Sequence, residues 1–446
     1  MLLRRIVNVR DHEVGGLWLS FAYFFCLLCG YYILRPVRDE MGIQGGIENL
    51  HWVFTGTFLV MLVAVPAFGV AAARLPRHRL LPWVYYFFIL NLLAFFVLFQ
   101  SGVAAVYVAR GFFIWVSVFN LFVVSVFWSF MADLYTNEQA RRLFGFIAAG
   151  GSTGAIVGPV LTANLVAPLG PANLLLITVL LLLLAVACIH ALARRAAARV
   201  AADLAVRERT TGAEEPIAAT NSTDAPLGGG MLAGVKHVLR SPYLLGICLY
   251  IWLYTTLSTF LYFEQAHIVA NAFVEPERRT VLFAYIDLSV NALTVIGQLF
   301  VLRRIVARFG LSTALALIPA LVAVGFGILG LFPLLAVLVA FQVIRRAGNF
   351  AIARPAREML FTVVAREDKY KSKNFIDTVV YRGGDAVSAW AYAGLARLGM
   401  GLSGIAWVAL PLAIIWLLTG VALGAKQERL RQPPHGRADP NAALSS

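Results

Sequence analysis

The sequence contains twelve stretches of about twenty apolar residues, separated by short polar segments. A helix rises about 1.5 Å per residue, so each stretch is long enough to cross the roughly 30 Å hydrocarbon core of a bilayer. Hydrophobic residues make up 60% of the 446 residues and charged residues 13%, a balance that excludes the soluble globular classes. The sequence therefore predicts an all-α polytopic membrane protein with twelve transmembrane helices.

The predicted helices fall into two groups of six. The first group covers residues 14–34, 49–73, 80–100, 104–132, 142–167 and 171–193. The second group covers residues 243–264, 280–302, 311–330, 333–354, 374–397 and 402–424. The segment between the groups is rich in Ala, Thr, Glu, Pro and Gly, which is typical of a flexible linker. The expected organisation is an N-terminal half over 1–193, a linker over 194–230, a C-terminal half over 231–424 and a tail over 425–446.

Basic residues gather in the segments on one side of the predicted membrane, the side of the N-terminus, the linker and the tail. The other side has few near its loops: Arg35, Arg38, Arg278, Arg279 and Arg397. Because cytoplasmic loops carry the excess of Lys and Arg, both termini and the linker are expected in the cytoplasm, with the chain in a plasma membrane such as the bacterial inner membrane. The net charge of +14 is explained by this orientation, so no nucleic-acid partner is expected.

The two halves resemble each other weakly. A Leu-aromatic-Thr triplet at 134–136 precedes a glycine pair at 150–151, and a similar triplet at 360–362 precedes a pair at 383–384. Two parallel six-helix repeats, with a substrate site near the midplane between them, are the arrangement of the major facilitator fold. The sequence predicts that fold.

Three segments resemble the ATP/ADP translocase (nucleotide transporter) family. They are residues 25–42 (FCLLCGYYILRPVRDEMG), 127–158 (FWSFMADLYTNEQARRLFGFIAAGGSTGAIVG) and 354–384. The resemblance implies a secondary active transporter that moves an organic anion, such as a nucleotide or a phosphorylated metabolite, by alternating access, for example as an antiporter. Arg38 stands where that family has Lys, so the expectation is limited to the fold and an anionic substrate and does not include exchange of ATP for ADP.

Arg345 and Arg346 lie near the middle of the tenth predicted span. A charged side chain there costs about 2.5 to 3.5 kcal/mol even on the lenient insertion scale, so both residues are functional candidates. Neighbouring helical residues point about 100° apart, so we expect one guanidinium to contact a transported anion and the other to pair with an acid. The available acids are Asp287, Asp377 and Asp385. The alternative is that both arginines belong to a purely structural ion-pair network.

A second basic cluster lies at the outer end of the first predicted span. Arg35 and Arg38 are three positions apart and share a helix face, so both can address one anion. Pro36 is expected to end or kink the helix at this point. In the alternative interpretation, the two arginines extend to the lipid headgroups or pair with Asp39 and Glu40.

Several single polar residues are weaker candidates. Arg110, Asn120, Asn349 and Arg382 could line a substrate cavity, although an arginine near a helix end often reaches the headgroups and a single amide often joins two helices. The carboxylates that could serve proton coupling or ion pairing are Glu264, Asp287, Asp377 and Asp385. A proton-coupled importer of another solute therefore remains an alternative function, as does a membrane sensor or scaffold that does not transport.

The remaining motifs point away from catalysis. Histidines are isolated, and the cysteines lie inside apolar stretches, so no catalytic, cofactor or metal site is expected. Gly150, Gly151, Gly154 and Gly158 are not followed by the Lys of a phosphate loop, and their spacing favours close packing of two helices. The expected protein is a monomer in the bilayer that is not an enzyme and binds a small anionic substrate.

Overall fold

The computed structural model describes residues 9–74, 77–210, 238–239, 241–300, 302–364, 372–373 and 375–431. Within these ranges the chain is helical, and eleven of the helices are long and apolar enough to cross a membrane. The remaining predicted span, the eleventh along the chain, is also present. It consists of the π-helical turn η4 (Ile376–Val380) followed by α15 (Tyr381–Arg397), which has only 17 residues. The predicted all-α membrane fold is confirmed.

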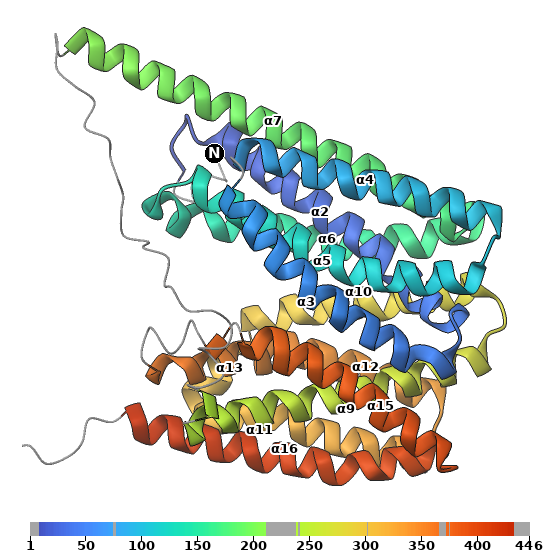
Figure 1. Ribbon diagram of the computed structural model, residues 1–446. Helices are drawn as coiled ribbons and strands as arrows, with labels where there is room; N and C mark the ends of the chain where they lie inside the picture. The colour runs from blue at the N-terminus through green and yellow to red at the C-terminus, as the bar shows by residue number, and fades with distance from the viewer. Residues whose placement is uncertain are drawn as a thin grey trace, which may run out of the picture.

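The helices follow the predicted spans closely (Figure 1). The N-terminal half consists of α2 (Val14–Gln44), α3 (Leu50–Arg74), α4 (Arg77–Ser101), α5 (Ala105–Leu134), α6 (Asn137–Leu169) and α7 (Pro171–Thr210), with a short turn η1 (Ile47–Asn49). The C-terminal half consists of α9 (Pro242–Ala272), α10 (Pro276–Phe300), α11 (Leu302–Leu331), α12 (Leu335–Gly348), the π-helical turn η2 (Asn349–Ala353), α13 (Arg354–Leu360), η3 (Phe361–Val363), η4, α15 and α16 (Leu402–Arg431).

Two helices run further than their apolar stretches. Helix α2 continues past Pro36 to Gln44, so the expectation that it ends there is wrong. Helix α7 continues beyond residue 193 to Thr210, because this Ala- and Arg-rich segment consists of strong helix formers. The first part of the expected flexible linker is therefore helical, and so are residues 425–431 of the expected tail. Residues 211–230 of the linker and 432–446 of the tail lie outside the described residues.

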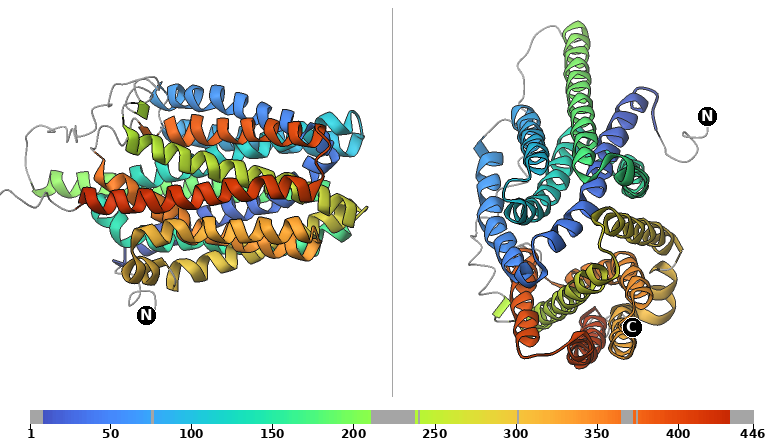
Figure 2. Two further views of the ribbon diagram at one scale, coloured as in Figure 1. Left: turned by 90° about the horizontal axis from the view of Figure 1, so that it is seen from below. Right: turned by 90° about the vertical axis from the view of Figure 1, so that its right-hand side faces the viewer.

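Buried apolar side chains form two separate cores, one in each half. One core lies among α2, α4, α5, α6 and α7, and the other lies among α9 to α16, with Ile43 of α2 and Leu50 of α3 contributing to it. The end-on view in Figure 2 shows the two groups of helices lying against each other. Between the halves, α10 packs against α2 and α6, and α15 packs against α3. A site at this interface is therefore built from both halves.

The bundle has two ends, called the linker face and the opposite face. The linker face is the end at which α2 begins and α7 and α16 end, and it lies to the left in Figure 1. The opposite face is the end at which α2 ends and α15 ends.

Glycines of α6 allow the closest helix contact in the N-terminal half. A Cβ atom built on Gly150, Gly154 or Gly158 would lie 2.5 to 2.6 Å from a backbone carbonyl oxygen of α2. Real Cβ atoms do not approach carbonyl oxygens so closely, so the two backbones touch only because these residues lack side chains. The predicted small-residue packing face is confirmed.

The Gly154→Ala variant is expected to destabilise the fold by about 1 to 3 kcal/mol, because its new methyl group overpacks a contact between two backbones. Thermal unfolding of the purified protein measures this effect. Gly145→Ala on the same helix is the matched control, because its Cβ would meet nothing within 4 Å. Equal unfolding temperatures for the two variants would contradict the close contact.

Candidate functional site

A polar cavity of about 220 Å³ lies between the two halves. Five arginines line it, two from α2, two from α12 and one from α15: Arg35, Arg38, Arg345, Arg346 and Arg382. The sequence predicted all five as candidates, and the fold brings the two from α2 next to the other three, which lie more than three hundred residues later in the chain. Asn349, another predicted candidate, also lines the cavity.

Asp287 of α10 is shared by two of these arginines. Arg346 donates a short hydrogen bond to its Oδ1 atom, and Nε of Arg35 lies 3.6 Å from its Oδ2 atom. Asp287 is 1% exposed and the two arginine side chains are 15% exposed or less. One carboxylate thus bridges α2, α10 and α12 across the two halves, and it neutralises only one of two positive charges.

Arg345 has a different environment from its neighbour. Its Nη1 donates to Oγ of Ser258 at 2.7 Å, and its Nη2 donates to Oε1 of Gln342 at 2.9 Å. Gln342 in turn donates to Gln265 at 2.6 Å, which fixes the orientation of its amide. Within the described side chains, no carboxylate pairs with Arg345, although it is only 6% exposed. A buried guanidinium held by neutral groups keeps its full charge available to a ligand.

The other two arginines are paired within their own helices. Arg38 donates from Nε and Nη2 to Oδ1 of Asp39, the nearer contact being 2.6 Å, and its guanidinium lies over the Phe113 ring. Nη1 of Arg382 lies 3.7 Å from Oδ2 of Asp385. The first pair is close and the second is loose, so Arg382 can turn toward a ligand.

The charges of the cavity do not balance. Five guanidinium groups face three carboxylates, those of Asp39, Asp287 and Asp385, which leaves a net charge of +2 among the described side chains when all are ionised. The side chain of Asp377, a predicted pairing partner, lies outside that described set. A small anion with two negative charges would balance the cavity, and arginine binds phosphate or carboxylate oxygens in pairs.

Aromatic rings form much of the remaining wall. The rings that line the cavity are Phe54, Phe58, Phe113, Tyr254, Tyr262, Phe350 and Tyr381. They come from both halves and leave flat apolar surface beside the arginines. The cavity therefore suits a ligand that has both an anionic group and an unsaturated or ring-shaped part.

The cavity is closed toward the opposite face by contacts between the halves. Arg279 of α10 donates from Nε and Nη2 to the two oxygens of Glu40 on α2, both at 2.7 Å. Tyr262 of α9 donates to Oδ1 of Asp39 at 3.1 Å. Glu40 is fully buried and Arg279 is 11% exposed. These contacts hold the two halves together between the cavity and the opposite face.

A model of the Major Facilitator Superfamily matches residues 19–372. The chain belongs to the major facilitator superfamily. As a member of this superfamily it shares its fold with solved transporters at low sequence identity. No curated protein sequence matches it.

Three solved structures illustrate this shared superfamily fold. An auto-inhibited POT family peptide transporter is 14% identical, with 95% of this chain and 99% of that chain covered and a TM-score of 0.60. A bacterial homologue of the human lysosomal transporter Spinster is 12% identical, with 96% and 100% covered and a TM-score of 0.59. A bacterial homologue of the iron transporter ferroportin is 14% identical, with 92% and 98% covered and a TM-score of 0.61. At these identities the likeness shows the fold alone.

Two predicted candidates lie away from the cavity of this superfamily member. Nε of Arg110 donates to the carbonyl oxygen of Gly45 at 2.7 Å, so it caps the end of α2 rather than lining the cavity. Asn120 on α5 is not among the lining residues. Both were proposed from their residue type within a span, and the sequence does not reveal which face of the helix they occupy.

Some residues that line the polar cavity could not be recognised as candidates from the sequence. Ser258, Gln342 and Tyr254 are ordinary residues of apolar helices, yet the first two hold Arg345 and all three face the cavity. Only the spacing of Gln342, three residues before Arg345 on one helix, could have pointed to a contact.

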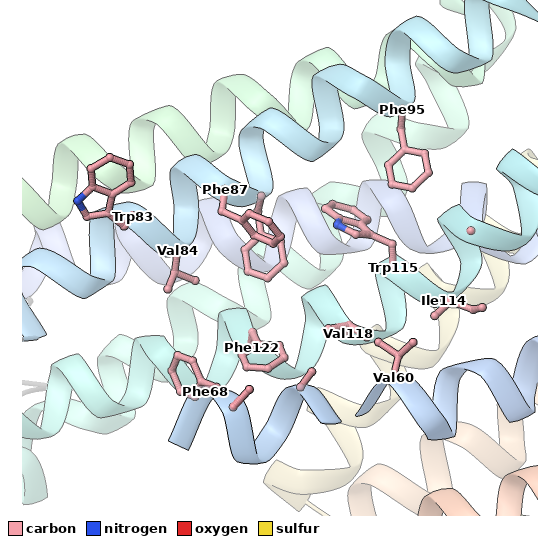
Figure 3. A pocket seen from close by; sticks show the side chains of 14 residues that line it. Val60, Phe68, Trp83, Val84, Phe87, Phe95, Ile114, Trp115, Val118 and Phe122 are labelled. Carbon is pink, nitrogen blue, oxygen red and sulfur yellow. The ribbon is translucent and has the colours of Figure 1, made fainter. Parts of the chain in front are cut away.

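A second, larger cavity has an apolar lining. It measures about 720 Å³, lies among α3, α4 and α5, and is lined by apolar side chains such as Phe68, Trp115 and Phe122 (Figure 3). Trp83 and Phe87 on its rim are strongly exposed, as expected for a surface that faces lipid. None of the described residues that line it is charged, so the polar cavity between the halves is the candidate substrate site.

Proposed function

We propose that this protein is a secondary transporter for a small organic dianion, bound between its two halves and moved by alternating access. The observation that supports this proposal is the net charge of +2 in the polar cavity, with Arg345 held by neutral partners. Burying a charge without a counter-charge is costly, so evolution of such a site is most simply explained by a ligand that supplies the missing charge.

Phosphate esters, including nucleotides, are the substrate class that we favour. Their phosphate oxygens match the paired N–H groups of arginine, and their ring systems match the aromatic wall. The resemblance of residues 25–42 and 127–158 to the nucleotide transporter family supports the same class. Dicarboxylates have the same charge but no ring, which makes them the alternative within this proposal.

The direction of access follows from the closed opposite face. Glu40 and Arg279 are joined there, which blocks access to the cavity from the opposite face, so we infer that the ligand enters from the linker face in this state. By the positive-inside rule we expect the linker face to lie in the cytoplasm, and we propose a plasma membrane such as the bacterial inner membrane as the location of the chain. A cavity of about 220 Å³ is smaller than the roughly 300 to 1,000 Å³ of typical ligand sites, so a nucleotide would require the halves to part further.

A thermal-shift screen of the purified protein tests the substrate class. We expect nucleotides or sugar phosphates to raise the unfolding temperature, because a ligand at a hundred times its dissociation constant stabilises the folded state by about 2.7 kcal/mol. The neutral nucleosides and sugars serve as matched controls. If the protein responds to none of the phosphorylated compounds and to no dicarboxylate, the proposed substrate class is wrong.

A further inference from the structure

Glu264 of α9 is a buried carboxyl group that the anion site does not use. It is fully buried, and its single hydrogen bond comes from the hydroxyl group of Tyr392 on α15, 3.5 Å from Oε1. Its Oε2 atom has no hydrogen-bond partner among the described residues, and no described cation forms a salt bridge with it. An ionised carboxylate is very costly in such a place, so the geometry requires the neutral acid.

The position of Glu264 relates it to the closed opposite face. It lies eight residues before the end of α9, about 12 Å from that face. Its neighbour Phe263 contacts Tyr392, with ring centroids 4.7 Å apart, and also Phe54 of the other half at 5.7 Å. Phe54, Phe263 and Tyr392 thus form an aromatic cluster, to which both halves contribute, and this cluster excludes water from the carboxyl group.

Further contacts between α3 and α15 extend this aromatic cluster. Nε1 of Trp390 donates to Thr55 at 3.0 Å, and the Trp390 ring lies 4.4 Å from the ring of His51. These contacts join the halves, so they must break when the opposite face opens. Water would then reach the region of Glu264 from that side.

We propose that Glu264 is a proton-binding site whose occupancy is linked to closure of the opposite face. In the closed state the carboxyl group is dry and holds its proton. In the open state water hydrates the carboxyl group, which ionises and releases its proton to the solution on that side. Since closure takes up a proton, acidic solution at the opposite face favours the closed state and alkaline solution favours the open state.

Few other titratable groups lie near Glu264 among the described residues. On α9 itself, the ring of His267 stacks on Tyr392, and Glu48 lies in η1, which packs on α9. His51 of α3 is buried, and both of its ring nitrogens lack a hydrogen-bond partner among the described residues.

The remaining helices that pack on α9 present few charges to it. Helix α12 presents the neutral Gln342 to Gln265, and α2 presents Asp39, which accepts from Tyr262. Helix α15 also carries Arg397 in its last turn, and α16 brings Lys426 over the ring of Tyr243 near the start of α9. The side chain of Asp377 in η4 lies outside the described set. None of the described groups supplies a counter-charge that contacts Glu264.

Distance measurements between spin labels test the linkage. Val103→Cys in the α4–α5 connection and Leu398→Cys in the α15–α16 connection place exposed labels on the two halves at the opposite face, in a background with the four native cysteines replaced. The expected result is a population with a short distance at low pH that gives way to a longer distance as the pH rises. One linked proton changes the ratio of the two populations by up to about tenfold per pH unit.

Glu264→Gln mimics the neutral acid and is expected to keep the short distance at every pH. Glu275→Gln is the matched control, an exposed carboxylate near the same face that should leave the pH dependence intact. Tyr392→Phe removes the hydrogen bond that favours the ionised form and should move the transition to higher pH, which provides a test if Glu264→Gln does not fold. An unchanged pH dependence in Glu264→Gln, or no shift in Tyr392→Phe, would overturn the proposal.

The inference rests on the proposed alternating access but not on the identity of the substrate. The label distances are measured without any ligand, so they can be independent of pH while the thermal-shift screen still identifies a dianion. Conversely, a pH-dependent distance with no dianion bound would retain the proton site and reject the substrate class.

Discussion

Arg345→Gln is expected to weaken the binding of an organic dianion by at least about 30-fold. Removing one partner of a buried charge interaction costs at least about 2 kcal/mol, and each 1.4 kcal/mol corresponds to a factor of ten in affinity. Arg345 is the lining arginine without a described carboxylate partner, so its charge is the one most available to a ligand. The measurement is the dissociation constant of the best ligand from the thermal-shift screen.

The same substitution should leave the stability of the ligand-free protein unchanged or slightly higher. No described carboxylate loses its partner when Arg345 becomes neutral, and a buried unpaired charge is removed. Arg346→Gln is the matched control on the adjacent residue, because it leaves Asp287 with only the 3.6 Å contact to Arg35 and should therefore lower the unfolding temperature. The assignment of Arg345 to the ligand is wrong if Arg345→Gln lowers stability as Arg346→Gln does and keeps its affinity.

Asp287→Asn is expected to destabilise the protein by about 3 to 5 kcal/mol. The substitution leaves Arg35 and Arg346 facing each other without a counter-charge in a buried site, and breaking a buried ion pair from one side costs this much. Denaturation of the purified protein in detergent measures the loss. An added dianion should restore part of the stability, because it can replace the missing carboxylate between the two guanidinium groups.

A double-mutant cycle separates this interaction from general disruption. In Asp287→Asn combined with Arg346→Gln, the charge of one arginine is removed together with that of its partner. We expect the double variant to be more stable than the sum of the two single effects predicts, by about 0.5 to 3 kcal/mol. Strictly additive effects would mean that Asp287 and Arg346 do not act as a pair, in contradiction to the shared carboxylate.

Most of the fold could be predicted because membrane helices are governed by one dominant rule. A span must be apolar over about twenty residues, so hydropathy located all twelve helices. The glycine spacing of α6 predicted a close helix contact, although not that its partner is α2. The ends of helices follow a different rule. Helix α2 continues past Pro36 and α7 past residue 193, because polar residues also form helices when good helix formers or tertiary contacts support them.

The extension of α2 changes the interpretation of its arginines. With the helix ending at residue 34, Arg35 and Arg38 would lie at the membrane surface and could reach the headgroups. With the helix continuing to Gln44, they lie within the bundle and line the cavity. The sequence named the right residues, but their depth depended on a helix end that hydropathy does not determine.

The division of roles between Arg345 and Arg346 shows the same limit. Their 100° separation predicted one paired and one unpaired guanidinium, and Asp287 was among the three named partners. Which arginine pairs depends on the rotation of α12 relative to α10, which is a property of the packed bundle. The neutral groups around Arg345 were not predicted, because Ser258 and Gln342 are ordinary residues in the sequence.

We propose that the cavity recognises two negative charges on its ligand. The most direct test compares the affinity of the purified protein for a phosphate ester and for the neutral alcohol of the same compound, such as a nucleoside monophosphate and its nucleoside. The proposed site predicts that the ester binds at least about 30-fold more tightly and that Arg345→Gln abolishes most of this difference. Equal affinity for the two compounds, or a preference that persists in Arg345→Gln, would contradict it.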